Sequence, residues 1–107
     1  MKYQVLQLPV EDDLCFRGWD DVQKYCPNSK DLLKRYKLVY EGELGDDYVV
    51  MPANKILEDL FRILNIDHPT DYRARSLSMS DTVALCDASG TPTSYWFCDS
   101  WGWAEIK

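Results

Sequence analysis

The feature that most constrains the fold is a broad apolar stripe on residues 54–65. Large apolar side chains recur there every three or four positions, which is the spacing of the buried face of an amphipathic helix. The stripe consists of Ile56, Leu57, Leu60, Phe61, Ile63 and Leu64. We expect Asn54 to cap this helix at its start and Asn65 to take the left-handed conformation at its end. Leu60 and Phe61 lie in the middle of the stripe, so both are expected to be buried against a sheet.

Several other segments have the pattern of β-strands. Residues 3–8 and 36–44 alternate between two faces, and they end at Pro9 and Gly45. Further along the chain, a turn-forming cluster at residues 88–92 separates two apolar runs. The remaining predicted strands are residues 82–86, 95–98 and 101–106, with an additional short strand at residues 48–51.

A shorter helix is expected at residues 19–26, bounded by Gly18 and Pro27, and Ser29 is a candidate cap for another brief turn. The resulting order is β-α-β-α-β-β-β, in which strands outnumber helices and end in a meander. This order predicts the α+β class. We expect one compact domain over residues 1–107, with a mainly antiparallel sheet of about four to five strands and two helices.

The composition of the chain indicates the cellular compartment in which the protein is expected to work. The longest wholly apolar stretch is residues 49–53, which is too short to cross a membrane, and the start of the chain lacks the apolar region of a secretory signal. We therefore expect a cytoplasmic protein without disulfides, and the spacing of the cysteines gives no zinc motif. The net charge of −6 lacks the basic footprint of a nucleic-acid-binding protein. The cysteines are Cys15, Cys26, Cys86 and Cys98.

Four blocks of the chain, in the right order, resemble the YodL-like family. The most specific block spans residues 57–85, where family members have the pattern LxxLYxxFNxxHPxDfxGRSLSVSDVVxL. The tail at residues 95–105 is similar to the family's YYVDSxGFxE. Residues 3–8 and 36–44 are similar to its YxIYQL and YxLVYxGxL. Together the blocks cover nearly the whole chain.

The chain departs from the family pattern at three places. Residues 45–53 look like an insertion, Ala74 stands where the family often has Gly, and Trp103 replaces a Phe. The resemblance implies a setting: such proteins are similar to small accessory proteins of bacterial conjugative elements and phages, and they also occur as modules of multidomain proteins. The family carries no agreed catalytic activity. The resemblance therefore favours a non-enzymatic protein-interaction module of a bacterial mobile genetic element, with an unknown protein partner and no cofactor.

The candidate partner-binding residues lie in two segments, 72–81 and 101–103. Arg73 and Arg75 alternate, so in an extended segment they would project from one side, and guanidinium groups suit carboxylates or phosphates. The tail tryptophans are expected to share one strand face beside the arginines; they either pack in the core or, if exposed, anchor an interface. The candidates are Tyr72, Arg73, Arg75, Asp81, Trp101 and Trp103.

Two alternatives place function elsewhere. In the first, an acidic face imitates DNA phosphates and inhibits a host defence nuclease of a restriction or CRISPR system. Its residues are Glu41, Glu43, Asp46 and Asp47. In the second, the chain is a small hydrolase that uses Ser78, Ser80 or His68. The sequence lacks a G-x-S-x-G elbow, and serine and aspartate at positions 80 and 81 are typical of a turn that starts the next strand.

Overall fold

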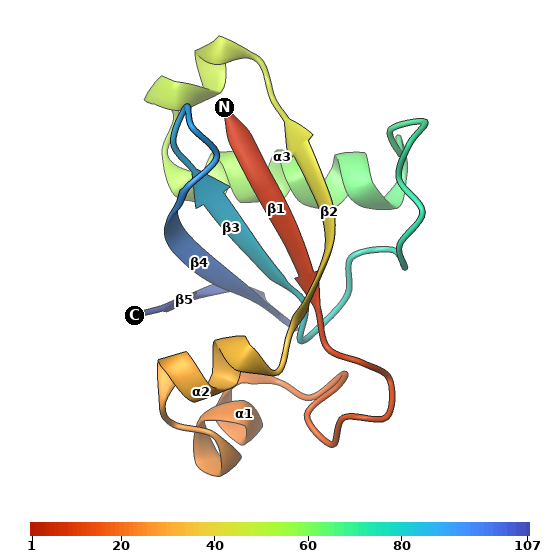
Figure 1. The fold of residues 1–107 in the computed structure, drawn as a ribbon, viewed down its shortest axis with the longest axis vertical. Coiled ribbons are helices and arrows are strands. Elements are labelled where there is room, and N and C mark those ends of the chain that lie inside the picture. The colour runs from red at the N-terminus through yellow and green to blue at the C-terminus, as the bar shows by residue number, and fades with distance from the viewer.

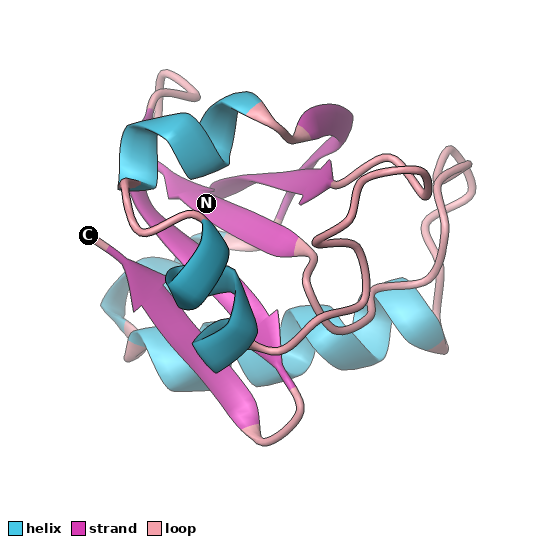
Figure 2. Cartoon of the chain, turned by 90° about the horizontal axis from the view of Figure 1, so that it is seen from below, coloured by secondary structure: helices cyan, strands magenta, loops and turns pink.

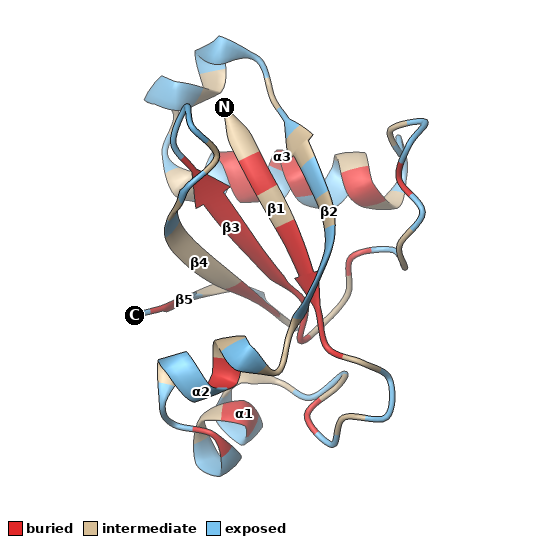
Figure 3. Cartoon of the chain, in the orientation of Figure 1, coloured by how far each residue is buried: buried red, intermediate tan, exposed pale blue.

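Five strands form one antiparallel sheet in the computed structural model, which describes residues 1–107 (Figure 1). The strands are β1 (Lys2–Gln7), β2 (Lys37–Glu43), β3 (Thr82–Cys86), β4 (Pro92–Asp99) and β5 (Gly102–Ile106). Their order across the sheet is β2-β1-β3-β4-β5, and every neighbouring pair is antiparallel. The central strand β3 is buried at all of its positions, because it has a strand on each side and helices near both faces (Figure 3). The α+β class and the antiparallel sheet are confirmed.

The helices lie on opposite faces of the sheet. They are α1 (Trp19–Tyr25), α2 (Ser29–Lys34) and α3 (Ala53–Asn65), and a 3-10 helix, η1 (Asp46–Val50), precedes α3. Figure 2 shows α3 on one side of the sheet and the shorter helices on the other. The chain thus has one α-helix more than the two expected. The segment after Asn28 is a short helix because the side chain of Asn28, not that of Ser29, accepts a hydrogen bond from the Asp31 amide at 3.0 Å.

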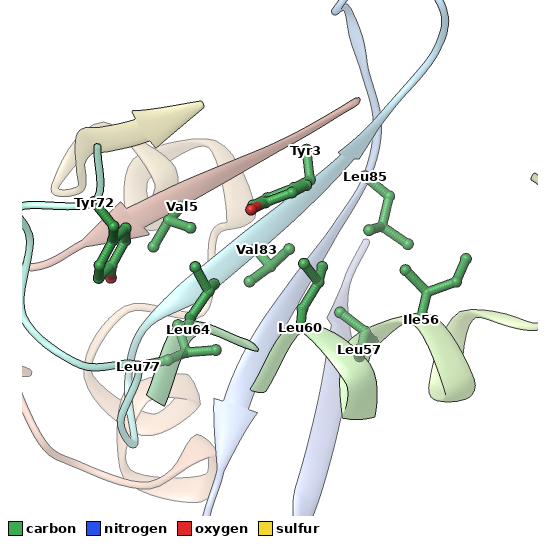
Figure 4. Close-up of a cluster of buried hydrophobic side chains, with 10 residues drawn as sticks. All are labelled: Tyr3, Val5, Ile56, Leu57, Leu60, Leu64, Tyr72, Leu77, Val83 and Leu85. Carbon is green, nitrogen blue, oxygen red and sulfur yellow. The ribbon is translucent and has the colours of Figure 1, made fainter. Parts of the chain in front are cut away.

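The α3 side holds the larger of two cores. In Figure 4 the apolar side chains of α3 point at the inward-facing residues of β1 and β3. Strand alternation supplies these residues, since Val5 pairs with Val83 and Tyr3 pairs with Leu85. The cluster consists of Tyr3, Val5, Ile56, Leu57, Leu60, Leu64, Tyr72, Leu77, Val83 and Leu85. This arrangement confirms the predicted burial of Leu60.

The second core lies between the sheet and the two short helices. It consists of Leu8, Leu14, Val22, Cys26, Leu32, Phe97 and Ile106. Phe97 belongs to this core, whereas its neighbour Trp96 packs against the α3 side. Strand β4 therefore supplies side chains to both cores, and its aromatic run divides between the two faces.

Three expectations about α3 are wrong. Pro52, not Asn54, precedes the helix, and the Pro52 carbonyl accepts hydrogen bonds from the amides of Lys55 and Ile56. Asn65 is the last helical residue, and its side-chain amide donates to the Leu77 carbonyl at 3.0 Å. Phe61 is 41% exposed, because the buried stripe of α3 is narrower than the apolar stripe in the sequence.

Residues 48–51 are not a strand, because the segment contains most of η1 and has no strand to pair with. The inner edge of β2 is already paired with β1. Instead, the Tyr48 hydroxyl donates a hydrogen bond of 2.7 Å to Asp59 of α3. This contact anchors η1 on the helix and leaves Val49 and Val50 exposed.

Candidate functional site

The segment that contains the predicted arginine pair, residues 72–81, joins α3 to β3 and ends on a buried carboxylate. Asp81 is fully buried. Its Oδ2 accepts hydrogen bonds from the Ser78 amide at 2.8 Å and from Gln7 Nε2 at 3.1 Å, and Arg75 Nη2 lies 3.6 Å from its Oδ1. Burial raises the pKa of Asp81 to about 6, although these donors favour the charged form. Because Asp81 is inside the protein, its predicted place on a partner surface is wrong.

Ser80 has a structural role at the start of β3. Its φ of +80° is left-handed, which is uncommon for a non-glycine residue and is fixed here by three contacts. The Ser80 amide donates to the Cys98 carbonyl at 2.9 Å. Its hydroxyl accepts from the Phe16 amide at 2.8 Å, and its carbonyl accepts from the Tyr36 hydroxyl at 2.5 Å. The predicted turn before β3 is confirmed, and its serine hydroxyl holds the loop that follows β1.

The two arginines do not form a common recognition patch. Arg75 is half-buried: its Nη2 donates to the Leu8 carbonyl at 2.9 Å, and its guanidinium lies over the Phe16 ring at 5.4 Å. Arg73 is exposed and folds back on its own loop, where it donates to the Thr70 carbonyl at 2.6 Å. The expectation that both project from one extended side is therefore wrong. The role of Arg75 is structural, because its hydrogen bond to Leu8 joins its segment to the residue after β1.

Tyr72 lies away from the tail tryptophans. It is buried, and its ring packs edge-on against Tyr40 of β2 at 5.0 Å between centroids. Trp103 belongs to β5, and β2 and β5 are the two opposite edges of the sheet. The predicted grouping of Tyr72 with the tryptophans is therefore wrong. Trp101 and Trp103 do not share a strand face either, because Trp101 lies in the turn before β5.

Three aromatic residues lie near the end of the sheet where β4 turns into β5. Phe61 and Trp103 line one pocket there, and Trp101 lies in the turn between Ser100 and Gly102, which line the same pocket. We call Phe61, Trp101 and Trp103 the aromatic surface. Trp101 is 96% exposed at this turn, and Trp103 is partly buried against the α3 core. Sequence analysis selected the two tryptophans and missed Phe61. The signal for Phe61 was present, because the apolar stripe of α3 is wider than the contact that one sheet face makes with a helix.

A pocket of about 280 Å³ lies between α3 and the β4–β5 turn. Its lining residues are Glu58, Phe61, Cys98, Asp99, Ser100, Gly102 and Trp103. Two aromatic side chains and the carboxylate of Glu58 thus border one hollow, whereas the carboxylate of Asp99 faces α1. Burial raises the pKa of the Cys98 thiol to about 12, so this thiol is protonated at neutral pH and contributes a weakly polar wall.

The β4–β5 turn is held rigidly. Asp99 Oδ1 accepts hydrogen bonds from the Trp19 amide at 3.2 Å and from the Ser100 amide at 2.9 Å. Gly102 has a φ of +116°, a conformation that side-chain-bearing residues rarely adopt, and a Cβ there would meet nothing within 4 Å. The turn therefore requires glycine for its backbone conformation, and it holds Trp101 in the solvent.

The acidic residues lie at the opposite edge of the sheet. Glu41 and Glu43 are exposed on β2, and Asp46 and Asp47 are exposed on η1. Two adjoining surface hollows share Lys2 and Glu43; one also contains Glu41 and Asp71, and the other contains Asp46 and Asp87. Carboxylates therefore gather on this edge around one lysine. Asp47 lines neither hollow.

The residues of the hydrolase hypothesis are not joined by hydrogen bonds. His68 is exposed and packs against the Tyr72 ring at 5.3 Å between centroids. Ser80 is fully buried, and the hydroxyl of Ser78 approaches Asp81 at 3.5 Å. All four cysteines are free, and no group of three or more His, Cys, Asp or Glu side chains is arranged to hold a metal ion. None of the helices has the length and apolar character needed to cross a membrane.

These features define a small α+β domain with one helix across a five-stranded antiparallel sheet and an aromatic surface at one end of it. The family model of the YodL-like domain matches residues 2–107, so the chain belongs to the YodL-like domain family. No curated protein and no solved structure matches the chain significantly. The family match therefore gives the class of the domain and assigns no chemistry to particular residues.

Proposed function

We propose that this YodL-like domain is a non-enzymatic protein-interaction module that binds its partner through the aromatic surface. The observation that carries this proposal is the 96% exposure of Trp101 at the tip of a rigid turn. Tryptophan is enriched at the energetic centres of protein interfaces, where it fills a partner's pocket. Phe61 and the partly exposed Trp103 extend the apolar contact on either side of the pocket.

The internal hydrogen bonds of the serine-rich segment support a non-enzymatic role. The hydroxyl of Ser80 holds the Phe16 amide, and the Asp81 carboxylate holds the Ser78 amide and the Gln7 side chain. A nucleophilic serine would need its hydroxyl beside a general base and open to a substrate. The serines and the aspartate of this segment therefore have structural roles.

The charge of the protein favours a partner with a basic contact surface. The chain carries a net charge of −6, and Glu58 borders the aromatic surface. Complementary charge speeds association and disfavours like-charged partners. We further propose that the module works in the cytoplasm of bacteria as part of a mobile genetic element, which is the setting implied by the family resemblance.

Affinity capture with a matched control variant tests the proposed function. Tyr25 on α1 is also exposed, but it lies outside the aromatic surface. A specific partner captured from cells that carry the gene should be retained by the wild type and by Tyr25→Ala. We expect Trp101→Ala to weaken its binding by about 30-fold or more, which corresponds to a hot-spot loss of about 2 kcal/mol. Equal binding by the two variants would refute the proposed surface.

The carboxylates around Lys2 favour a second candidate, an acidic inhibitor of a host defence nuclease. Glu41, Glu43 and Asp46 lie together on one edge and could occupy a basic nucleic-acid site. In this case charge reversal by Glu41→Lys with Asp46→Lys abolishes inhibition of the nuclease, and Trp101→Ala leaves inhibition intact. The opposite pattern favours the aromatic surface.

A further inference from the structure

We propose that the pocket between α3 and the β4–β5 turn binds the side chain of an arginine presented by the partner protein. This inference rests on the proposed function, since it names the chemistry that the aromatic surface recognises. The pocket of about 280 Å³ is at or below the size of ordinary small-molecule sites, so it suits a single inserted side chain.

Aromatic and acidic groups border the same hollow. Phe61 and Trp103 border the pocket from α3 and β5, and Glu58 borders it from α3. An aromatic face attracts a cation through its quadrupole, and a carboxylate attracts the same cation through its charge. A neutral apolar side chain would contact the two aromatic rings but gain nothing from the carboxylate.

The Glu58 carboxylate keeps its oxygens available for a ligand. Glu58 is exposed and makes no hydrogen bond or ion pair within the protein. The Asp99 carboxylate faces α1 instead, where its Oδ1 accepts a hydrogen bond from the Trp19 amide. Glu58 is therefore the carboxylate of this pocket that a cationic side chain can reach.

Arginine suits this pocket better than lysine does. A guanidinium is planar, so it can stack on Phe61 or Trp103 and still direct its N–H groups at a carboxylate. A lysine ammonium is compact and strongly hydrated, and it gains less from an aromatic wall. The pocket, which has two aromatic side chains in its lining, therefore favours arginine.

Nuclear magnetic resonance with blocked amino acids tests the pocket directly. N-acetyl-arginine amide is the probe, and N-acetyl-citrulline amide is its neutral control of nearly the same shape. We expect arginine to shift the Trp103 indole and Gly102 amide resonances saturably, with a Kd in the millimolar range. Citrulline should bind several-fold more weakly. The absence of a saturable arginine shift, or equal binding of citrulline, would overturn the inference.

A pair of charge variants separates the pocket from general electrostatics. Glu58→Gln removes one carboxylate of the pocket, whereas Glu41→Gln removes the same charge from β2 at the opposite edge of the sheet. We expect Glu58→Gln to weaken arginine binding about three- to five-fold, as expected for a partly exposed charge pair, and Glu41→Gln to leave it unchanged. Equal effects of the two variants would contradict a specific site.

Partner binding distinguishes failure of this inference from failure of the proposed function. If partner binding is lost in Trp101→Ala but unchanged in Glu58→Gln and in excess blocked arginine, the aromatic surface stands and the arginine pocket is refuted. If Trp101→Ala binds the partner normally, the proposed function itself fails. Loss of binding in both Trp101→Ala and Glu58→Gln, with Glu41→Gln unaffected, supports both.

Discussion

Replacing Leu60 by alanine should destabilise the protein far more than replacing its neighbour Phe61. Leu60 is fully buried at the centre of α3 and faces the sheet, as Figure 4 shows, whereas Phe61 is 41% exposed. The adjacent positions therefore test which part of the apolar stripe is buried. Both substitutions give alanine, so the helix propensity of the new residue is the same at the two positions.

The expected magnitudes follow from burial. Leu60→Ala removes a fully enclosed side chain and leaves a cavity between α3 and the sheet, at a cost of about 3 kcal/mol. For a domain of this size, this loss lowers the Tm by roughly 10–15 °C. Phe61→Ala removes a side chain at a surface pocket that water already reaches. No enclosed cavity forms, and the cost should be about 1–1.5 kcal/mol.

Urea unfolding followed by tryptophan fluorescence measures both costs, and the slope m should be unchanged if each variant keeps the fold. A loss below 1 kcal/mol for Leu60→Ala would refute the packing of α3 on the sheet. A loss for Phe61→Ala that equals that of Leu60→Ala would show that Phe61 is buried and is no part of an exposed surface.

Three further predictions concern the buried carboxyl, the β4–β5 turn and the cysteines. The pKa of Asp81 is raised to about 6 in the folded protein, so the folded state binds its proton more tightly than the unfolded state. The contribution of Asp81 to stability is therefore greatest below pH 4 and falls by about 2 kcal/mol as the pH rises from 4 to 7. The stability of the wild type relative to Asp81→Asn, from urea unfolding at both pH values, should fall accordingly, and a constant difference would contradict the raised pKa. Gly102→Ala should cost about 1–2 kcal/mol through its φ of +116° alone, since a Cβ meets nothing there; an unchanged Tm would contradict the strain. All four cysteines are free, so a reductant should leave the Tm unchanged, and a drop of several degrees would reveal a disulfide.

The elements with regular patterns could be predicted from the sequence. The alternation of β1 and β2, the apolar run Val83–Cys86 of β3 and the stripe of α3 each indicated the element that the structure contains. The secondary structure of residues 48–51 was harder to predict. Val49 and Val50 have high strand propensity, but the sheet has no strand that pairs with them. Strand pairing is a non-local property, and a local pattern does not contain it.

The candidate site was only partly predictable for the same reason. Trp101 and Trp103 could be selected from their residue type, but nothing local shows that α3 brings Phe61 and Glu58 to the same pocket. The arginine pair was misassigned because Arg75 bonds to Leu8, a residue far away in the sequence. Local alternation indicated a shared direction for Arg73 and Arg75 that the long-range contact overrides.

Hydrogen–deuterium exchange of the free and the partner-bound protein is the most direct test of the account. The central claim is that the partner covers the aromatic surface formed by Phe61, Trp101 and Trp103. Partner binding should slow exchange at the amides of the β4–β5 turn, residues 99–103, while exchange along β2 and η1 stays as in the free protein. Protection confined to residues 37–50, with the β4–β5 turn unchanged, would contradict the claim and place the interface on the acidic edge.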